Sequence, residues 1–436
     1  MSNYHLIILV HGVWGNSSHL AYVEKQIHEN IHSYDGTILY THKTGSHLGY
    51  LTYDGIDVNG KRISDEVWEQ TKLIEQEKGG KVTKFSVVGY SLGGLISRYC
   101  IGYLSSQGYF DNIEPINFTT FCTPHVGVLV PQSHNFSARL YNRIAPLFLA
   151  DTGSQFFLRD KVGEFGKPLL VWMADPRSKF YKALAKFKYK SLYANVVNDK
   201  RCSWYTASIS PDDKVNSLYN KRPENINCKY IKGYQPNVID VTKPFYYEKV
   251  DNLRESSNHR FKWFWKTLNW IKLIGTITVY SPIFIIISIV QRIYNRKRVS
   301  EFFQNESNDL LHMYEHEHEV GGGEEEEQQQ QQQYHSSVFA DISNKVDDEQ
   351  ETLVEDIYDA MNWKVSHSST FPPIRLDHNQ SYIVEKLNTI GWKKYPIIIR
   401  HTKGTHGAAI IKHYDPNFDE GEVIVRHFVK EVFKLD

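Results

Sequence analysis

The chain has 436 residues, with 50 Lys plus Arg and 50 Asp plus Glu, so its formal net charge at pH 7 is zero. This balance excludes a global electrostatic field that would attract nucleic acid, and the length permits one large domain with insertions or two domains. The cysteines lack metal-site or redox-pair spacing, so we expect buried free thiols at Cys100, Cys122, Cys202 and Cys228.

The first residues carry no basic region and no cleavage site, and the apolar run Leu6–Val10 is too short for a secretion signal. We therefore expect a protein that is not secreted and that faces the cytosol. Aromatic residues make up 14% of the chain, which favours contact with a lipid surface.

Short apolar segments alternate with amphipathic helices from residue 6 to residue 125, as in a parallel sheet covered by helices on both faces. The expected strands are Leu6–Val10, Thr37–Thr41, Phe85–Val88 and Ile116–Cys122. Helical spacing of apolar residues marks the segments between them, at Leu20, Val23, Ile27 and Ile31, at Ile63, Val67 and Ile74, and at Leu92, Leu95, Ile96, Tyr99, Cys100 and Tyr103.

The rest of the chain divides by composition. Residues 128–190 have helical spacing and predict a cap over a core of residues 1–210, with a further strand at Leu192–Val197. Residues 211–369 form an expected insertion that begins as an irregular excursion from the sheet (211–260), continues as a hydrophobic block (261–298) and includes a disordered Glu/Gln tract (315–350). Residues 370–436 are expected to return to the core, with a strand at Tyr395–Arg400.

Gly89-Tyr90-Ser91-Leu92-Gly93 fits the G-x-S-x-G nucleophile elbow. A predicted strand ends at Gly89 and an amphipathic helix begins just after Ser91, which is the context that this strained turn requires. The alternative is a glycine-rich turn that merely caps a helix. The context favours Ser91 as a nucleophile.

A second loop would complete the site. The Leu92 amide is one expected oxyanion donor, and the loop after the first strand, His11-Gly12-Val13-Trp14-Gly15, offers the Val13 amide as the other. Gly12, like the elbow residues Gly89 and Gly93, would permit close approach of the backbone. We expect His11 to order this loop rather than to shuttle protons.

In a hydrolase of this class the acid and then the histidine follow the serine along the chain. Asp199, just after the strand Leu192–Val197, is the expected acid, and Asp175, Asp212 and Asp213 remain alternatives. His406 follows the last predicted strand across a glycine-containing loop and is the expected base, with His401 and His413 as alternatives. His406 would take the Ser91 proton while Asp199 orients the ring.

This chemistry needs no metal and no cofactor. His312, His316 and His318 could attract a transition metal, but in an acidic, polar tract we expect them to be solvated.

These motifs resemble those of the fungal serine esterases and lipases, a family that includes a yeast lipid-droplet phospholipase. The matching segments are Leu9–Gly15, Leu51–Gly60, the elbow, Thr123-Pro124-His125-Val126-Gly127 and Tyr193–Asp199. The resemblance covers residues 5–210 well and 370–412 moderately. It implies an α/β-hydrolase fold, hydrolysis of glycerolipid esters, and the roles of Ser91, Asp199 and His406, while His125 would line the pocket or order a loop. In place of the family's Val-Pro pair after the acid stands Arg201-Cys202-Ser203-Trp204.

Leu273–Val290 contains 18 residues without a charge, long enough as a helix to cross a hydrocarbon core. However, a single crossing would separate Ser91 from His406. Basic residues flank both ends of the block, and Pro282 lies in its middle. We therefore expect a shallow hairpin or in-plane anchor with Trp263, Trp265 and Trp270 at the interface, the alternative being a buried core helix.

The expected function is that of a serine lipase or phospholipase, acting on phospholipid or acylglycerol esters at a membrane or lipid-droplet surface. The expected location is the cytosolic side of a lipid droplet or of the endoplasmic reticulum membrane. The expected partners are the lipid substrate and the membrane through residues 261–298, with no nucleic acid. A catalytically silent lipid-surface tether and an acyltransferase with the same triad are the alternatives.

Overall fold

A six-stranded parallel sheet forms the centre of the computed structural model, which describes residues 2–32, 35–131, 136–163, 166–215, 217, 222–248, 286, 289–304, 312–314 and 374–436. The strand order is β2-β1-β3-β4-β5-β8, and each neighbouring pair is parallel. The strands are β1 (Ser2–Val10), β2 (Ile38–Lys43), β3 (Gly80–Tyr90), β4 (Glu114–Phe121), β5 (Tyr189–Asn195) and β8 (Lys393–Ile397).

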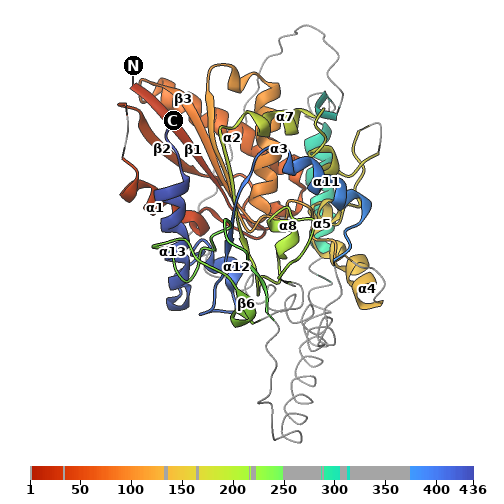
Figure 1. Cartoon of the computed structure of the whole chain (residues 1–436). Helices are drawn as coiled ribbons and strands as arrows, with labels where there is room; N and C mark the ends of the chain where they lie inside the picture. Colours follow the sequence, from red (N-terminus) through yellow and green to blue (C-terminus); the bar gives the residue numbers. More distant parts are fainter. Residues whose placement is uncertain are drawn as a thin grey trace, which may run out of the picture.

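The sheet lies between two layers of helices (Figure 1). Alternate side chains of β1 point to opposite faces: Leu6, Ile8 and Val10 join one apolar cluster, and Ile7 and Leu9 join the other. The first cluster is covered by α2 (Ile56–Gln76), α3 (Leu92–Ser106), α7 (Lys179–Lys186) and α11 (His378–Asn388), and the second by α1 (Ala21–Asn30) and α13 (Asp419–His427). The expected parallel sheet with helices on both faces is therefore confirmed.

Short helices connect these layers. Residues 128–190 contain several helices, as expected of a cap: α4 (Phe136–Ile144), η4 (Ala145–Phe148), α5 (Ala150–Phe156), α6 (Leu169–Trp172) and α7. The other short elements are η1 (Ser17–Leu20), η2 (Gly49–Tyr53), η3 (Tyr109–Asp111), α8 (Trp204–Ala207), η5 (Pro223–Asn225), β6 (Ile226–Asn227), β7 (Tyr246–Tyr247), η6 (His312–Tyr314), α12 (Thr405–Ala408), η7 (Pro416–Phe418) and η8 (Phe428–Val432).

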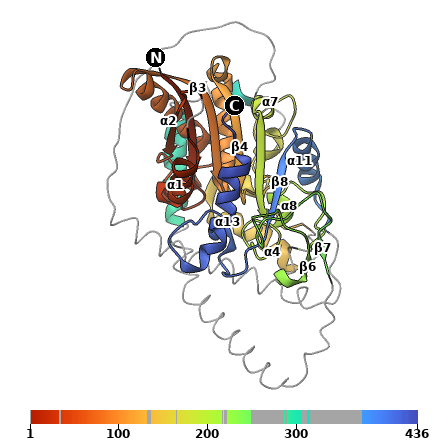
Figure 2. The ribbon, with the colours of Figure 1, turned by 60° about the vertical axis from the view of Figure 1, so that its left-hand side comes forward.

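The last strand, β8, pairs with β5 although about 200 residues separate them in sequence. Figure 2 shows β8 beyond β4 with α11 outside it. A connection of this length brings the C-terminal segment back to the sheet, as the sequence predicted. Part of the segment expected to leave the sheet also touches its edge at β8: the Ile239 amide donates to Pro396 O at 2.9 Å, and the Ile398 amide donates to Asn237 O at 2.9 Å.

Two pieces of the expected insertion pack on the core. Residues 289–304 form a helix whose Phe302 and Phe303 contact the larger apolar cluster, and Met313 of η6 is buried in it. His312 is the first residue of η6, while His316 and His318 lie outside the described residues.

Several predictions fall on segments outside the described residues: most of Leu273–Val290, Pro282, the three tryptophans at 263, 265 and 270, and the Glu/Gln tract at 315–350. Among the described helices, none combines the length and the apolar character that a membrane crossing requires.

Candidate active site

Ser91 occupies the sharp turn between β3, which ends at Tyr90, and α3, which begins at Leu92. Its φ of 55° and ψ of −126° are strained for a residue with a side chain, so the surrounding contacts must hold the turn. The Ser91 amide donates to Phe121 O at 2.9 Å, and the Thr123 hydroxyl donates to Ser91 O at 2.9 Å. Both contacts come from the end of β4.

Three glycines allow backbone segments to meet at this turn. A Cβ atom at Gly12 would stand 2.7 Å from Ser91 Cβ, and one at Gly89 would stand 2.5 Å from Gly94 Cα. A Cβ atom at Gly93 would collide with the carbonyl oxygens of Val10 and His11. The loop after β1 therefore lies directly against the elbow, and no larger residue fits without displacing one of them.

Ser91, His406 and Asp199 form one hydrogen-bonded chain. His406 Nε2 lies 3.0 Å from Ser91 Oγ, and His406 Nδ1 lies 2.9 Å from Asp199 Oδ2. Ser91, Asp199 and His406 lie in the segments that follow β3, β5 and β8, respectively. Because these strands are parallel, the segments after them meet at the same edge of the sheet. A serine, an imidazole and a carboxylate in this order are the groups needed to activate a hydroxyl as a nucleophile.

The Asp199 carboxylate is buried and accepts four hydrogen bonds. Oδ1 accepts from the amides of Arg201 at 3.1 Å and Cys202 at 2.9 Å, and Oδ2 accepts from Asn195 Nδ2 at 3.2 Å as well as from His406. Burial raises the pKa of Asp199, but the charge of His406 and the hydrogen bonds outweigh it and the net pKa is lowered. Two of the four donors are thus backbone amides of residues shortly after the acid, a role that proline could not fill.

His406 lies in α12, a single turn whose N-terminal loop is fixed at two points. The Thr405 hydroxyl donates to Asn198 O at 2.9 Å, next to the acid. Upstream, the buried Glu420 accepts from the amides of Arg400 and His401 at 2.5 and 2.8 Å. These contacts, together with the Tyr90 ring 5.1 Å from the imidazole, hold His406 toward Ser91.

The two amides expected to bind an oxyanion belong to the residue after Ser91 and to the residue after Gly12, which packs on Ser91. Leu92 is the first residue of α3, so its amide has no acceptor within the helix and points outward at the positive end of the helix dipole. Val13 follows Gly12, which packs on Ser91. Its neighbour Trp14 has a φ of 52° and is held by hydrogen bonds from its amide to Thr52 Oγ1 and from its indole to Tyr53 OH.

The alternative acids and bases contact other partners. Asp175 Oδ2 lies 2.9 Å from Arg177 Nη2, and this guanidinium lowers the Asp175 pKa. His401 is exposed and pairs with Asp419 at 2.9 Å, and the His413 ring lies 5.0 Å from that of Phe418. The remaining two acids accept hydrogen bonds from serines near them in sequence, Asp212 from Ser210 and Asp213 from Ser217.

The other histidines near the elbow are buried. His125 Nε2 lies 2.9 Å from Thr120 Oγ1, and burial lowers the His125 pKa well below its ordinary value. His11 and His47 stack with ring centroids 3.8 Å apart, and burial lowers the pKa of His11 to about 4. Neutral rings at these positions order the loops, which agrees with the roles expected for His11 and His125.

Among the described residues, one cluster has a geometry that could hold a metal: Cys122 Sγ, Asp199 and His406 have ligand atoms within 4.8 Å of one another. Burial raises the pKa of the Cys122 thiol well above 9, so the thiolate that zinc prefers is disfavoured. Asp199 and His406 are also engaged with each other. The donor set therefore suits the hydrogen-bonded triad better than a metal.

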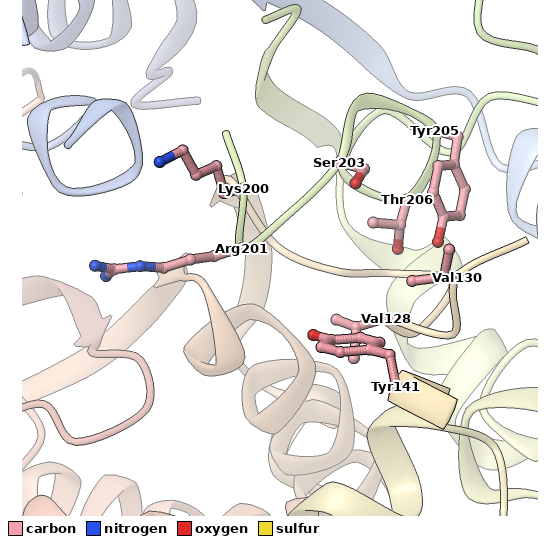
Figure 3. Close-up of a pocket in the computed structure, with 8 residues that line it drawn as sticks. All are labelled: Val128, Val130, Tyr141, Lys200, Arg201, Ser203, Tyr205 and Thr206. Carbon is pink, nitrogen blue, oxygen red and sulfur yellow. The ribbon is translucent and has the colours of Figure 1, made fainter. Parts of the chain in front are cut away.

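A small pocket lies beside the acid loop (Figure 3). Apolar side chains from the loop after β4 and from α4 face polar residues that follow Asp199. The pocket is lined by Val128, Val130, Tyr141, Lys200, Arg201, Ser203, Tyr205 and Thr206. Neither Ser91 nor His406 is among these residues, so the pocket adjoins the triad without containing the reacting atoms.

Residues 1–210 match the family described as "Putative serine esterase (DUF676)". This segment of the chain is similar to that family. It contains the elbow, the loop after β1 and Asp199, whereas His406 lies outside the matched residues. The resemblance to serine esterases predicted from the motifs is therefore confirmed.

Two relatives are fungal. The chain is 30% identical over 213 residues to "Putative lipase ROG1" from Saccharomyces cerevisiae, covering 47% of this chain and 28% of that protein. It is 28% identical over 245 residues to "Putative lipase C4A8.10" from Schizosaccharomyces pombe, covering 55% of this chain and 30% of that protein. The chain thus spans less than a third of the length of either relative.

Among solved structures, the chain is similar to phospholipase PlaB from Legionella pneumophila, with 13% identity, a TM-score of 0.28 and coverage of 49% of this chain and 42% of that one. An extracellular α/β-hydrolase from a Paenibacillus species is 19% identical with a TM-score of 0.23, covering 44% of this chain and 77% of that one. The fold assignment as an α/β-hydrolase rests on the strand order and on the elbow after β3.

Sequence reasoning missed three residues that shape the site. Asn195 donates to Asp199, Thr123 holds the elbow carbonyl, and Glu420 fixes the loop before His406. Thr123 lies in a segment that matches the family, which was a usable signal. Asn195 and Glu420 carry no local pattern that distinguishes them from ordinary polar residues.

Proposed function

We propose that the protein is a serine esterase in which Ser91 is the nucleophile, His406 the general base and Asp199 the residue that orients His406. The observation that carries this proposal is the 3.0 Å contact between His406 Nε2 and Ser91 Oγ, continued by the 2.9 Å contact to Asp199. Ser91 Oγ forms a bond to the ester carbonyl carbon as its proton moves to His406 Nε2.

The tetrahedral intermediate collapses when its bond to the alcohol oxygen breaks and His406 returns the proton to that oxygen. The acyl group then remains on Ser91 Oγ, and water, deprotonated by His406, releases it as a carboxylic acid. We assign the amides of Val13 and Leu92 to the oxyanion, because both border Ser91 and Leu92 lies at the N-terminus of α3.

Lipid esters are the substrate class that we propose. The relatives' description as lipases supports this, as do large apolar side chains exposed on the cap. Leu140 and Ile144 of α4 and Leu147 of η4 are 43%, 41% and 48% exposed. Apolar residues grouped on a protein surface mark sites that meet another apolar phase. Phospholipids and acylglycerols both fit this description.

We further propose that the protein acts on the cytosolic side of a lipid droplet or of the endoplasmic reticulum membrane, held there by residues 261–298. At the end of this block the described helix turns an apolar stripe outward: Ile286, Ile289, Val290, Ile293 and Tyr294 are all more than 40% exposed. Their spacing places them on one helix face, adjoining the uncharged run Leu273–Val290. Arg292 lies within this stretch and Arg296 just after it, as expected beside anionic lipid.

Figure 1 shows α4 at the same end of the molecule as α12, the end where the strands of the sheet finish. The exposed cap residues therefore lie on the same side of the molecule as the triad. A lipid surface in contact with this end would present its esters to Ser91.

The decisive experiment compares the wild-type protein with Ser91→Ala on emulsions of mixed phospholipid and triacylglycerol, with lipid products identified by mass spectrometry. We expect release of fatty acid that the variant lacks, and labelling by a fluorophosphonate probe that the variant also lacks. Labelling with no product would favour the silent tether. Transfer of acyl groups to an added alcohol in place of hydrolysis would favour the acyltransferase.

Membrane attachment is tested separately by deleting residues 261–285, because Asn295 and Arg298 beyond them contact the core. We expect the deletion to move the protein into the soluble fraction while activity on a soluble ester persists. Continued sedimentation with membranes would show that the attachment lies elsewhere in the chain.

A further inference from the structure

Asp54 has a fully buried carboxylate that is shared by side chains from two distant parts of the chain. Arg62 Nη2, from α2, lies 2.9 Å from Oδ2. Arg298, from helix 289–304, places Nη2 2.6 Å from Oδ1 and Nε 3.1 Å from Oδ2. Asn295 Nδ2 donates to Oδ1 at 2.9 Å. The carboxylate is thus paired on both oxygens, as a buried charge requires.

This cluster lies at the end of the segment that holds the proposed oxyanion loop. Asp54 directly follows η2, in which Thr52 Oγ1 accepts the Trp14 amide at 3.2 Å and Tyr53 OH accepts the Trp14 indole at 2.6 Å. Asn295 Nδ2 also donates to Tyr53 O at 3.2 Å. Trp14 adjoins Val13, and its left-handed φ persists only because these contacts fix it.

The geometry points to helix 289–304 as a positioning element for the oxyanion loop, with Arg298 acting on catalysis through Asp54, Tyr53 and Trp14. Arg298 does not touch the reacting atoms and is a positioning residue. This inference rests on the proposed function of Ser91. It adds helix 289–304, which is far from the triad in sequence, to the elements that influence the rate.

The physical reason is the precision that an oxyanion hole requires. A displacement of about 1 Å in a catalytic group costs roughly a hundredfold in rate. When Arg298 is removed, Arg62 still pairs with Asp54, so the carboxylate is not stranded and the fold can persist. The end of η2 is then held by one guanidinium in place of two, so we expect the positions of Tyr53 and Trp14 to be less well fixed.

A consequence concerns the hydrophobic block. In sequence, helix 289–304 overlaps the end of the uncharged run Leu273–Val290, and its residues Asn295 and Arg298 contact Asp54. Displacement of the helix would therefore lower the rate at Ser91 even when the triad itself is intact.

The test uses full-length protein and p-nitrophenyl butyrate, a soluble ester, with active sites counted by fluorophosphonate labelling. Arg298→Ala is compared with Lys297→Ala, its neighbour of equal charge, whose side chain is 75% exposed and pairs along the helix with Glu301. We expect Arg298→Ala to lower kcat per labelled site by roughly tenfold to a hundredfold, with KM within about twofold. Lys297→Ala should match the wild type, and Arg298→Lys should recover part of the loss.

A second variant keeps the inference testable if Arg298→Ala does not fold. Tyr53→Phe keeps the side chains that contact Asp54 and removes the hydroxyl that accepts the Trp14 indole. It should lower kcat per site as well, whereas Tyr40→Phe, which removes a hydroxyl bonded to Gln70, should not. In the Tyr53→Phe background, Arg298→Ala should have a smaller effect than it has alone, because both act on the same path.

Equal kcat per labelled site in Arg298→Ala and Lys297→Ala, or in Tyr53→Phe and the wild type, would overturn the inference. If Arg298 only stabilised the fold, Arg298→Ala would lower the number of labelled sites but would leave kcat per labelled site unchanged. Wild-type protein without Ser91-dependent turnover would overturn the proposed function and the inference together.

Discussion

Gly12 lies so close to Ser91 that a Cβ atom on residue 12 would stand 2.7 Å from Ser91 Cβ and 3.3 Å from Ser91 Oγ. Ser91 cannot move away from such an atom without breaking hydrogen bonds, because its amide donates to Phe121 O and its carbonyl accepts from the Thr123 hydroxyl. The loop after β1 and the elbow can therefore lie this close together only because residue 12 has no side chain.

We predict that Gly12→Ala lowers kcat/KM on a soluble ester by at least about a hundredfold, because the loop carrying Val13 must move away from Ser91. Gly45→Ala is the matched control, since a Cβ atom there meets only Glu66 Oε1 at 3.9 Å. Circular dichroism and thermal unfolding verify that both variants fold. Full activity in a folded Gly12→Ala variant would contradict the fitted arrangement.

The choice of acid has its own test. Asp199→Asn should lower kcat by about 10⁴, because an amide cannot hold the His406 tautomer that accepts the Ser91 proton. Asp175→Asn should leave the rate of the folded protein unchanged, because its carboxylate pairs with Arg177. Steady-state kinetics on the same soluble ester distinguish the two. The assignment fails if Asp175→Asn is the more damaging change.

Much of the prediction came from patterns among residues that are close together in the sequence. The strand, elbow and helix around Ser91 could be read from sequence because the glycines, the apolar run and the helical spacing all lie within a few residues of one another. Chain order and strand ends then pointed to Asp199 and His406, and the His406 ring does lie between the two other side chains, with Nδ1 bonded to Asp199 and Nε2 bonded to Ser91.

Long-range contacts could not be read in the same way. Asp54 and Arg298 are 244 residues apart, and no periodicity links an acidic residue in one loop to an arginine in a distant helix. The pairing of residues 237–239 with β8 was missed for the same reason, since a short edge contact leaves no alternating apolar pattern. Such contacts depend on the three-dimensional arrangement, which local propensity does not contain.

The cluster of Cys122 with Asp199 and His406 gives a third prediction. Because burial keeps the thiol protonated and the other two groups bind each other, dialysis against EDTA should leave Ser91-dependent activity within about twofold of its starting value. Cys122→Ala should retain comparable activity. Activity lost to EDTA and restored by Zn²⁺ would show that the cluster binds a functional metal.

The last prediction concerns pH and stability. Burial, and secondarily the charge of Lys84, lower the pKa of His5 from 6.5 to about 3. Its ring stays neutral in the folded protein, where Nε2 lies 2.7 Å from Ser86 Oγ. Between about pH 6.5 and 3 the unfolded chain therefore binds a proton that the folded protein does not, so the free energy of unfolding falls as the pH falls.

At pH 5 this difference amounts to at most about 2 kcal/mol relative to neutral pH. His5→Gln, which can keep a hydrogen bond to Ser86, should lack this component and lose less stability between pH 7.5 and pH 5 than the wild type. His401→Gln is the control, because His401 is exposed and its pKa is raised by Asp419. Urea unfolding at both pH values measures the difference, and equal losses in the wild type and His5→Gln would mean that the His5 ring is charged in the folded protein.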